Sequence, residues 1–445
     1  MTELKPVTKP LVAIVGRPNV GKSTLFNRLV GKQSAIVSDV EGTTRDRVMS
    51  GVVWDDQSFI LVDTGGLALF PETDIWIQVK AQVELAINEA DVIILVVDTA
   101  SGLTAADIDV ADLLRMTSKP VVLAVNKSDN EDRAATAVEF YELGLGIPVP
   151  ISAYHNVGID DLMSQVVEIF PGNQQIIDNH PDLRLAIVGR TNVGKSALLN
   201  AITDSERSIV SDQPGTTRDS IDSMLTLENK SILLIDTAGI RRRGKIGLGI
   251  ERYSVLRSIR AIDRSDVATV VIDASELGTN QDAHVASYVV DAFKGLVITV
   301  NKWDLARNLR IDKNKAIEII RNRWRFASYA PICFTSALNK KGMKSLLETV
   351  EKVYSEWTKG VPRYDLSRTI MNAVSDHPPS PSGRGSLKIY GVTQDDVAPP
   401  SFTFYVNRSD MVHFSYRRYL ENSIRNIYGF EGCPLRMRFK GRKDN

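Results

Sequence analysis

Two eight-residue segments of the chain have the residue types and spacing of a phosphate-binding loop. Residues 16–23 read GRPNVGKS and residues 189–196 read GRTNVGKS, and both fit G-x-x-x-x-G-K-[ST]. Glycines let the backbone wrap closely around phosphates with its N–H groups pointing inward, and the following helix adds a positive N-terminal dipole. The lysine of this P-loop is expected to reach the β- and γ-phosphates of a nucleotide, and the serine to bind Mg²⁺. These residues are Lys22, Ser23, Lys195 and Ser196.

A second phosphate-site motif, D-x-x-G, follows each P-loop lysine at the same distance. Asp63–Gly66 (DTGG) and Asp236–Gly239 (DTAG) both begin 41 residues after the lysine, and each ends an apolar run. An aspartate at a strand end can hold Mg²⁺ through water, and a glycine N–H can contact the γ-phosphate. The shared spacing predicts one phosphate site in each half of the chain.

Threonines between these two motifs are candidate sensors of the γ-phosphate. Residues 41–46 read EGTTRD and residues 214–219 read PGTTRD. A threonine in such a loop can close over Mg²⁺ and the γ-phosphate, which makes the loop sensitive to the bound nucleotide. We favour the second threonine of each pair, Thr44 and Thr217, over the first.

An N-K-x-D motif in each half indicates guanine as the base. Asn126–Asp129 (NKSD) and Asn301–Asp304 (NKWD) each end a strand-like apolar run. The aspartate can accept hydrogen bonds from N1–H and the 2-amino group of guanine, whereas adenine offers neither donor and leaves a costly unpaired carboxylate. The asparagine suits the opposite base edge, and the lysine stem can cover the ring. At the next strand end, the pairs Ser152-Ala153 and Ser336-Ala337 place a backbone N–H where it can contact guanine O6.

These motifs define the expected site residues of each half. In the first half the expected nucleotide contacts are Gly16, Arg17, Pro18, Asn19, Val20, Gly21, Lys22, Ser23, Thr24, Asp63, Thr64, Gly65, Gly66, Asn126, Lys127, Asp129, Ser152 and Ala153. In the second half they are Gly189, Arg190, Thr191, Asn192, Val193, Gly194, Lys195, Ser196, Ala197, Asp236, Thr237, Ala238, Gly239, Asn301, Lys302, Asp304, Ser336 and Ala337. The Mg²⁺ ligands are expected to be Ser23, Thr44, Asp63, Ser196, Thr217 and Asp236, and the catalytic residues Lys22, Thr44, Gly66, Lys195, Thr217 and Gly239.

The elements that must position these residues also occur twice. An offset of 173 residues relates Lys22 to Lys195 and Asp63 to Asp236, which indicates a duplicated domain rather than a short repeat. In each copy near-continuous Val/Ile/Leu runs alternate with helical patterns, which predicts an α/β fold with a mainly parallel sheet and helices on both faces. The expected strands are residues 11–15, 59–63, 92–98, 120–126 and 148–152 in the first copy, and residues 183–188, 232–236, 267–273, 295–301 and 331–336 in the second.

Two further segments complete the expected organisation. Residues 49–63 predict an antiparallel hairpin at the sheet edge, with a polar turn at residues 55–57. From Pro362 the pattern changes to helix, two strands, helix and strand, which predicts a compact α+β module. We expect a first domain at residues 10–171, a linker at 172–182, a second domain at 183–358 and the C-terminal module at 359–445. We call the two domains the first and second repeat.

Composition narrows the possible functions. Hydrophobic residues make up 43% and charged residues 24% of the chain, as in soluble globular proteins. Neither a membrane-spanning run nor a secretory signal is evident, so we expect a cytoplasmic protein. Cys333 and Cys433 have neither a metal-site nor a disulfide spacing. Net charge is zero, yet residues 361–445 contain 13 Lys and Arg against 8 Asp and Glu, which hints at an anionic partner.

Together the motifs resemble the Der (EngA) family of bacterial GTPases, of the TrmE–Era–Der group. The resemblance rests on GRPNVGKS/GRTNVGKS, GTTRD, DTGG/DTAG and NKSD/NKWD in two copies, and it covers essentially the whole chain. It implies a cytoplasmic GTPase that uses GTP, GDP and Mg²⁺ and acts in assembly of the large (50S) ribosomal subunit, with that subunit and its rRNA as partners. It also implies a KH-like C-terminal domain. We expect a monomer.

The resemblance adds expectations about mechanism. Asn19 and Asn192 complete the expected catalytic residues, because they match an asparagine that is similar to a potassium ligand. K⁺ bound there is expected to stimulate hydrolysis; a purely structural asparagine is the alternative. Leu67 and Ile240 follow the D-x-x-G motifs where Ras-like enzymes have a water-orienting glutamine, so intrinsic turnover is expected to be slow. The basic cluster Arg241–Arg243 lies in an expected switch segment, which is a hypothesis for nucleotide-dependent contact with RNA or with the KH-like module.

Several alternatives remain open. The C-terminal module has no G-x-x-G loop, so its cations either contact rRNA phosphates or belong to a packing module that transmits nucleotide state. These cations are Arg417, Arg418, Arg436, Arg438, Lys440, Arg442 and Lys443. A second interpretation is a GTP-gated structural protein that contacts no RNA. The N-K-x-D motifs disfavour a kinase or ATPase, and no second catalytic domain supports a tRNA-modifying enzyme.

Overall fold

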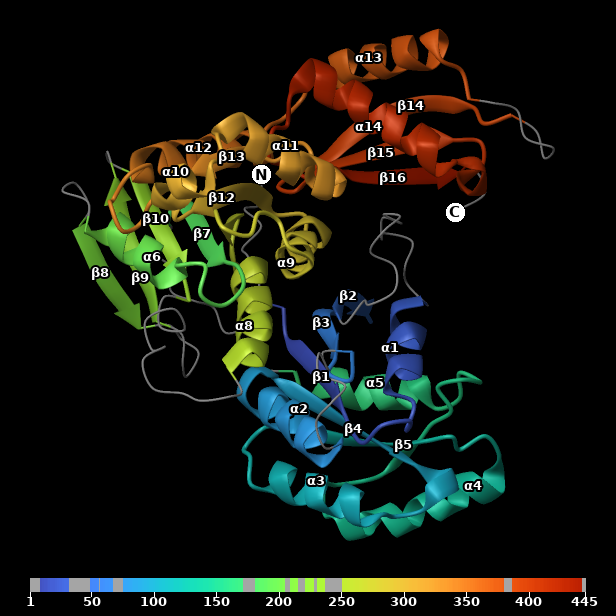
Figure 1. Cartoon of the computed structure of the whole chain (residues 1–445). Helices are drawn as coiled ribbons and strands as arrows, with labels where there is room; N and C mark the ends of the chain where they lie inside the picture. The colour runs from blue at the N-terminus through green and yellow to red at the C-terminus, as the bar shows by residue number, and fades with distance from the viewer. Residues whose placement is uncertain are drawn as a thin grey trace. The chain divides into compact units, whose positions relative to one another are not determined.

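Figure 1 shows the computed structural model of the chain. It describes residues 9–31, 49–55, 57–66, 75–170, 181–204, 209–214, 221–227, 230–236, 250–379 and 386–441. The chain divides into two compact units, residues 1–177 with 247–256, and residues 178–246 with 257–445. Each unit is described by itself. The predicted domain boundaries remain predictions, because the second repeat and the C-terminal module share the second unit.

The first repeat forms a six-stranded sheet in the order β2-β3-β1-β4-β5-β6. These strands are β1 (Leu11–Val15), β2 (Met49–Trp54), β3 (Gln57–Asp63), β4 (Val92–Asp98), β5 (Val121–Asn126) and β6 (Val149–Pro150). All neighbouring pairs are parallel except β2 and β3, where Met49 lies opposite Val62. The expected hairpin is therefore confirmed. Strands β1 and β4 are buried along their whole length, as their apolar runs predict for a sheet covered on both faces.

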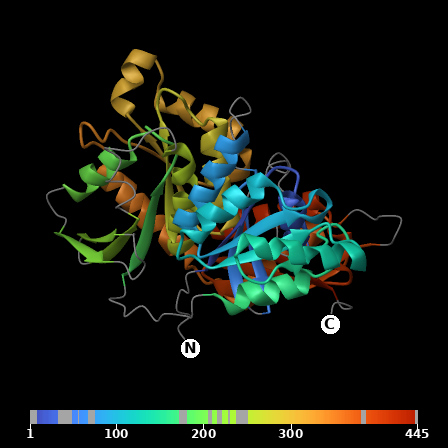
Figure 2. The ribbon, with the colours of Figure 1, turned by 90° about the horizontal axis from the view of Figure 1, so that it is seen from below.

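Helices lie on both sides of this sheet (Figure 1 and Figure 2). They are α1 (Lys22–Gly31), α2 (Ile75–Glu89), α3 (Ala105–Arg115), α4 (Glu131–Thr136) and α5 (Ile159–Glu168). Apolar residues of α1 and α5, including Phe26 and Leu162, form one core cluster with Val12, Ile14 and Ile94. Helix α2 packs against β1 and α3.

The second repeat forms a seven-stranded sheet in the order β13-β12-β11-β7-β10-β9-β8. These strands are β7 (Leu183–Val188), β8 (Ile209–Pro214), β9 (Ile221–Leu227), β10 (Lys230–Ile235), β11 (Val267–Asp273), β12 (Gly295–Asn301) and β13 (Ile332–Phe334). Strand β8 was not expected, because IVSDQP has a polar second half. It pairs antiparallel with β9, from Ile209 opposite Thr226 to Pro214 opposite Ile221.

The helices of the second repeat follow the same alternation with strands. They are α6 (Lys195–Thr203), α8 (Ile250–Arg264), α9 (Asn280–Asp291), α10 (Ala306–Leu309), α11 (Lys313–Arg323) and α12 (Met343–Trp357). None of the helices within the described ranges is long and apolar enough to cross a membrane.

The C-terminal module has the helix–strand–strand–helix–strand order expected from sequence. Its elements are α13 (Arg363–Asp376), β14 (Ile389–Val397), β15 (Pro400–Val406), α14 (Phe414–Tyr428) and β16 (Arg436–Gly441). Strand β15 is central, antiparallel to β14 and parallel to β16. The two helices pack on this sheet through the buried residues Leu366, Ile370, Leu420 and Ile424. Phe402 is fully buried there.

The module packs directly on the second repeat through residues 430–433. The Leu296 N–H at the start of β12 donates to the Gly432 carbonyl at 2.7 Å, and the Gly432 N–H donates to the Tyr329 carbonyl at 2.9 Å. Phe430 donates its N–H to Glu356 Oε2 at 2.6 Å. One continuous apolar core contains residues of both parts, from Val297 and Val353 to Phe402.

Candidate nucleotide-binding sites

Each P-loop connects the first strand of its repeat to the following helix, β1 to α1 and β7 to α6. Two glycines are required by close approach as well as by a positive φ. Gly16 has φ 145°, and a Cβ there would lie 2.3 Å from the Val96 carbonyl oxygen; Gly21 has φ 98°, with its Cβ 2.2 Å from Asn126 Nδ2. Gly189 and Gly194 have equivalent conformations and approaches in the second repeat. Any side chain at these positions would push the loop away from its neighbours.

The P-loop lysines are buried and point back into their loops. Lys22 Nζ donates to the carbonyls of Gly16 and Arg17, both at 2.8 Å. Lys195 Nζ donates to the carbonyls of Gly189, at 2.5 Å, and Arg190. Burial lowers the pKa of Lys22 to about 8, with Asp63 acting to raise it and Arg17 to lower it. This ammonium is poorly solvated, so a phosphate that approaches it gains a strong electrostatic contact.

The structure brings together Ser23 and Asp63, two of the three expected Mg²⁺ ligands of the first repeat. Ser23 Oγ donates to Asp63 Oδ2 at 2.5 Å, and the Gly65 N–H donates to Asp63 Oδ1 at 2.9 Å. Thr64 Oγ1 donates to the Ile14 carbonyl at 2.7 Å and ties the motif to β1. A hydroxyl beside a carboxylate is the kind of oxygen pair that Mg²⁺ binds together with phosphate oxygens. When bound, this ion would neutralise charge on the phosphates.

The second phosphate site is described in part. Asp236 follows β10 with φ 57°, and its N–H donates to Asp222 Oδ1 at 2.8 Å. Several expected residues lie outside the described residues, so the structure says nothing of their placement. They are Thr44, Thr217, Thr237, Ala238, Gly239, Leu67, Ile240 and the basic cluster Arg241–Arg243.

The N-K-x-D asparagines connect all three loops around the base position. Asn126 Nδ2 donates to the Val20 carbonyl of the P-loop at 2.8 Å, and Asn126 Oδ1 accepts from the Ala153 N–H at 3.0 Å. Asn301 makes the same two bonds, to the Val193 carbonyl at 3.0 Å and from the Ala337 N–H at 3.1 Å. One side chain per site thus fixes the P-loop against the N-K-x-D and Ser-Ala loops.

The N-K-x-D aspartates are oriented by the serines of the Ser-Ala pairs. Ser152 Oγ donates to Asp129 Oδ1 at 2.7 Å, while Arg133 Nη1 contacts Asp129 Oδ2 at 3.0 Å. In the second repeat Ser336 Oγ donates to Asp304 Oδ1. A carboxylate fixed in this way is preorganised to accept two donors from one base edge, as guanine requires.

The N-K-x-D lysines have partners that sequence reasoning missed. Lys127 Nζ lies 2.6 Å from Asp98 Oδ2, and Lys302 Nζ lies 2.6 Å from Asp273 Oδ2. Although burial raises the pKa of Asp273, hydrogen bonds from Lys302 and Ser275 outweigh it, so the net shift is downward. Both aspartates end a Val/Ile-rich run at the common offset of 175 residues, a signal that was available in the sequence.

The P-loop arginines are anchored by a second missed pair of aspartates. Arg17 Nε lies 3.2 Å from Asp107 Oδ1, and Arg190 Nε lies 3.3 Å from Asp282 Oδ1. Asp107 and Asp282 each also close a capping box with a threonine at the start of α3 and α9. Burial raises the pKa of Asp282, and its hydrogen bonds from Thr279 act against this shift.

One missed contact distinguishes the two sites. Arg28 of α1 donates from Nε to the Ala153 carbonyl at 3.0 Å and from Nη2 to the Tyr154 carbonyl. At the offset of 173 residues the second repeat has Ala201, which is buried in α6. Ala201 cannot form the equivalent side-chain clamp on the base-binding loop of the second repeat.

Comparison with known proteins agrees with this geometry. Residues 11–127 and 184–302 each match the family described as 50S ribosome-binding GTPase. Residues 361–440 match the family described as KH-domain-like of EngA bacterial GTPase enzymes, C-terminal.

Full-length relatives are similar throughout. GTPase Der of Herpetosiphon aurantiacus is 49% identical over 443 residues, which cover 98% of this chain and 97% of the relative. GTPase Der of Chloroflexus aggregans is 48% identical, with 98% of each chain covered. GTPase Der of Alkaliphilus metalliredigens is 46% identical, with 98% of this chain and 99% of the relative covered. The chain therefore belongs to the Der (EngA) family, and it is a GTPase with two guanine-nucleotide sites and a KH-like C-terminal domain.

Proposed function

We propose that this chain is a GTP-gated assembly factor for the large ribosomal subunit, acting as a cytoplasmic monomer. The observation that carries the proposal is that both nucleotide-binding repeats match a family described as 50S ribosome-binding GTPase. GTP and GDP differ by the γ-phosphate, and a protein whose two nucleotide states bind a particle differently acts as a timer for that particle. In this role GTP promotes binding to pre-ribosomal particles and their rRNA, and hydrolysis releases the chain.

The expected site residues have specific roles in this proposal. Lys22 and Lys195 bind the phosphates, Ser23 and Asp63 hold Mg²⁺, and Asp129 and Asp304 select guanine. The equivalents Ser196 and Asp236 serve the second Mg²⁺, with Thr44 and Thr217 closing over the γ-phosphates next to Gly66 and Gly239. The bond between Ser23 and Asp63 and the shared bonding pattern of Asn126 and Asn301 support these roles.

Co-sedimentation with ribosomal particles tests the proposal. The purified chain is centrifuged with ribosomal subunits and a non-hydrolysable GTP analogue, GDP or no nucleotide. Large-subunit association with the GTP analogue alone is the expected result, and a chain carrying Asp129→Ala and Asp304→Ala is expected to lose it. Association with the small subunit, or with no particle in any nucleotide state, contradicts the proposal while leaving the GTPase activity in place.

The proposal includes potassium as a cofactor at Asn19 and Asn192. Both asparagines have left-handed backbones, with φ 65° and 64°, so one geometry serves both P-loops. Because asparagine also favours this conformation for steric reasons, the side chain must be tested apart from the backbone. Asn→Gly at each position keeps a left-handed φ accessible and removes the oxygen ligand. We expect faster hydrolysis in K⁺ than in Na⁺ for the unmodified chain, and equal rates in both salts for the Gly variants. Equal rates for the unmodified chain exclude the role.

A second role for the C-terminal module, transmission of nucleotide state, is favoured by its packing. The Arg436 guanidinium lies 4.4 Å from the centroid of the Phe293 ring, and Arg425 lies 4.0 Å from that of Tyr329, both rings belonging to the second repeat. These arginines stabilise the interface, whereas Arg418 and Lys440 are exposed. Contact between rRNA and the exposed cations remains a prediction; Arg442 and Lys443 lie beyond the described part of the chain.

A further inference from the structure

The two repeats differ most between the N-K-x-D motif and the Ser-Ala pair. In the first repeat this segment spans residues 127–151 and contains two Lys and Arg against five Asp and Glu. In the second it spans residues 302–335, is nine residues longer, and contains eight Lys and Arg against three Asp and Glu. The longer segment contains α10 and α11, where the first repeat has α4 and a 3₁₀ helix. The duplication has thus produced one acidic and one basic version of the same segment.

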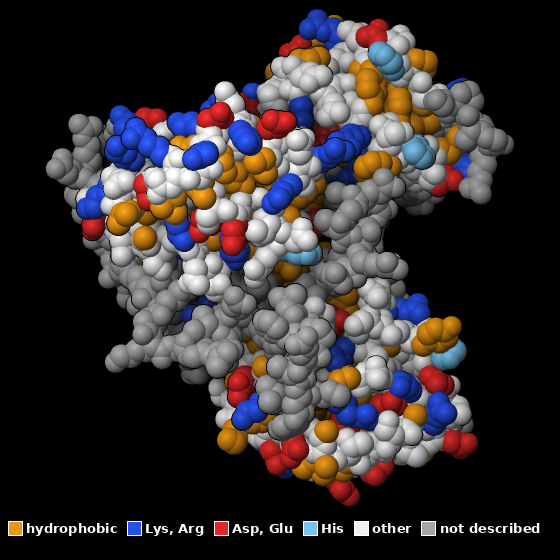
Figure 3. All heavy atoms as spheres, viewed as in Figure 1, with side chains coloured by type: hydrophobic (Ala, Val, Ile, Leu, Met, Phe, Trp, Pro, Cys, Tyr) orange, Lys and Arg blue, Asp and Glu red, His pale blue; other side chains and the backbone are white. Residues whose placement is uncertain are grey.

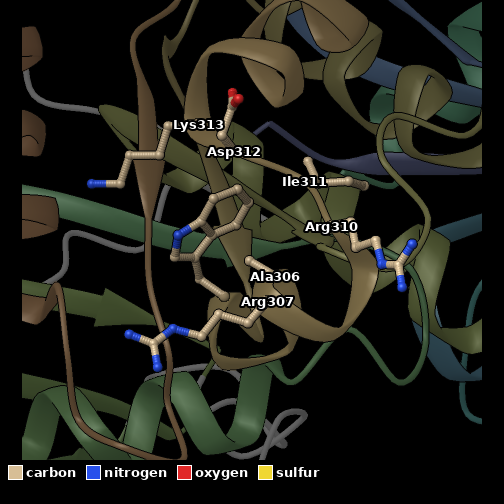
Figure 4. A pocket seen from close by; sticks show the side chains of 7 residues that line it. Ala306, Arg307, Arg310, Ile311, Asp312 and Lys313 are labelled. Carbon is tan, nitrogen blue, oxygen red and sulfur yellow. The ribbon is translucent and has the colours of Figure 1, made fainter.

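The basic segment lines an open pocket beside the second guanine site. The pocket has a volume of about 460 Å³ and is lined by Trp303, Arg307, Arg310, Ile311, Asp312 and Lys313. In Figure 4 Arg307 and Lys313 extend on one side of it and Arg310 on the other. Figure 3 shows further Lys and Arg side chains gathered over the face that carries α10 and α11.

An aromatic side chain and uncompensated cations line this pocket. Trp303 is partly exposed, and its ring centroid lies 4.3 Å from that of Phe334, which fixes the indole in place. Arg307 and Arg310 are exposed and make no ion pair with any residue in the described ranges. The acidic neighbour Asp312 is engaged as the helix cap of α11, where it accepts from the Lys315 N–H at 2.8 Å.

The pocket is separate from the guanine contacts of the same motif. Lys302 points to Asp273 at 2.6 Å, and Asp304 accepts from Ser336. Trp303 instead packs against Phe334, which also has Lys313 Nζ 5.4 Å from its ring centroid. At the corresponding position the first repeat has Ser128, which donates to the Val125 carbonyl and offers no aromatic surface.

We propose that this pocket binds single-stranded RNA, with a base stacked on Trp303 and the flanking phosphates bound by Arg307 and Arg310. An exposed aromatic ring with adjacent arginines is a stacking platform for bases of any sequence. The pairing of a ring with unpaired cations favours a nucleic acid over an acidic protein segment, which would need the cations alone. This inference rests on the proposed function and names a region of the chain that contacts ribosomal RNA.

Binding of a fluorescently labelled oligouridylate of about ten nucleotides to the full-length chain tests the site. Fluorescence anisotropy is measured across a salt series in the presence of GDP and Mg²⁺. Replacing both arginines, Arg307→Ala with Arg310→Ala, is expected to lower the salt slope of the affinity by about 1.4, because each lost phosphate contact on a single strand contributes roughly 0.7. Trp303→Ser, the residue of the first repeat, is expected to weaken binding about ten-fold through loss of stacking.

A matched control separates the site from general charge. Lys344→Ala with Arg368→Ala removes two exposed cations of the same unit, each in a surface ion pair with a residue of its own helix. This variant is expected to bind as the unmodified chain does. Equal losses in both double variants, or no oligouridylate binding by the unmodified chain at low salt, overturn the inference. Unchanged GTP turnover and melting temperature of the Arg307/Arg310 variant establish that its fold is intact.

Particle association distinguishes failure of the site from failure of the proposed function. If the unmodified chain binds large subunits and the Arg307/Arg310 variant binds oligouridylate equally well, the site inference is wrong and the function stands. If that variant loses particle association but keeps oligouridylate binding, the partner is an acidic protein surface and the RNA assignment is overturned. If the chain binds oligouridylate through this site but binds no ribosomal particle, the proposed function is wrong and the site inference stands.

Discussion

Arg28 has the clearest effect at the scale of single residues, because it makes two otherwise similar sites unequal. Its guanidinium donates to the carbonyls of Ala153 and Tyr154 and thereby fixes the Ser-Ala loop, which is expected to contact guanine. Arg28→Ala is expected to weaken GTP and GDP binding at the first site about ten-fold, because a hydrogen bond from a charged donor typically contributes about that factor. Isothermal titration of the chain carrying Asp304→Ala, which silences the second site, measures this loss.

The second site provides the control for Arg28. In a chain carrying Asp129→Ala, the same Arg28→Ala change is expected to leave nucleotide affinity unaltered. A loss at both sites means that Arg28 acts through the stability of the fold rather than through the loop. A loss for GTP but not GDP means that it acts on the phosphates.

Lys22 predicts a pH dependence of nucleotide binding at the first site. Its pKa is lowered to about 8 by burial, so above that pH the nucleotide-free lysine is largely neutral. Phosphates stabilise the ammonium and raise its pKa, so binding takes up a proton above pH 8 and affinity falls as pH rises. Titration calorimetry of the Asp304→Ala chain at pH 8.5, in two buffers of different ionisation heat, measures that proton.

The free energy of unfolding depends on the protonation of Lys22 too, but it changes with pH in the direction opposite to nucleotide affinity. The folded-state pKa of about 8 lies below the ordinary lysine value of 10.5, so unfolding takes up a proton between these pH values. The Lys22 contribution to stability therefore rises with pH across that window.

Lys22→Arg is the control for proton uptake on nucleotide binding. The arginine stays charged, so this variant is expected to abolish the uptake; uptake that persists assigns the titration to another group.

At this scale the motifs could be predicted from sequence, whereas the supporting role of Arg28 could not. Lys22, Asp63 and Asn126 belong to patterns in which residue type and spacing are both diagnostic. Arg28 is one arginine on an amphipathic helix, and only the fold brings it to a loop 125 residues later. Arg436 shows the converse, since its charge suggested RNA contact but its guanidinium packs over Phe293.

At the scale of elements, the interface of the C-terminal module depends on one glycine. Gly432 has φ 75°, and an added Cβ would lie 2.5 Å from Val353 Cγ2 and 3.1 Å from the Leu296 carbonyl oxygen. Gly432→Ala is expected to destabilise the second unit by about 2–6 kcal/mol, because backbone strain and overpacking each cost about 1–3 kcal/mol. Thermal unfolding followed by calorimetry measures the change.

Gly391 in β14 is a matched control for Gly432. An added Cβ at Gly391 meets no atom within 4 Å, so Gly391→Ala is expected to leave the melting temperature unaltered. If both alanine variants melt at the temperature of the unmodified chain, the close packing of residues 430–433 contributes nothing to stability.

The strands were predictable to the extent that they are buried. β4, β11 and β12 are seven-residue strands rich in Val, Ile and Leu, and each is buried along its whole length, as these residues predict. β8 was missed because its stability comes from pairing with β9 and not from an apolar pattern of its own. The pairing order of the C-terminal sheet likewise depends on contacts between segments distant in sequence.

At the scale of the whole molecule, the second repeat and the C-terminal module behave as one body. Trp357 of α12 is only 7% exposed, and Leu296, Val353 and Cys433 belong to the surfaces that meet there. A chain that ends at Thr358 is expected to expose this apolar surface, melt at a lower temperature and self-associate. Size-exclusion chromatography with calorimetry measures both effects. A monomeric truncated chain with an unchanged melting temperature contradicts this prediction.

The shared core also has a consequence in time, during synthesis of the chain. Domains generally fold in order from the N-terminus while translation proceeds at about 5–20 residues per second. The second repeat is complete at α12, but the residues that cover the start of β12 and the face of Val353 are about 80 residues further along the chain. Its apolar face is therefore uncovered for roughly 4–16 s in every newly made molecule. In that interval the nascent chain presents a binding surface for chaperones that the finished protein no longer has.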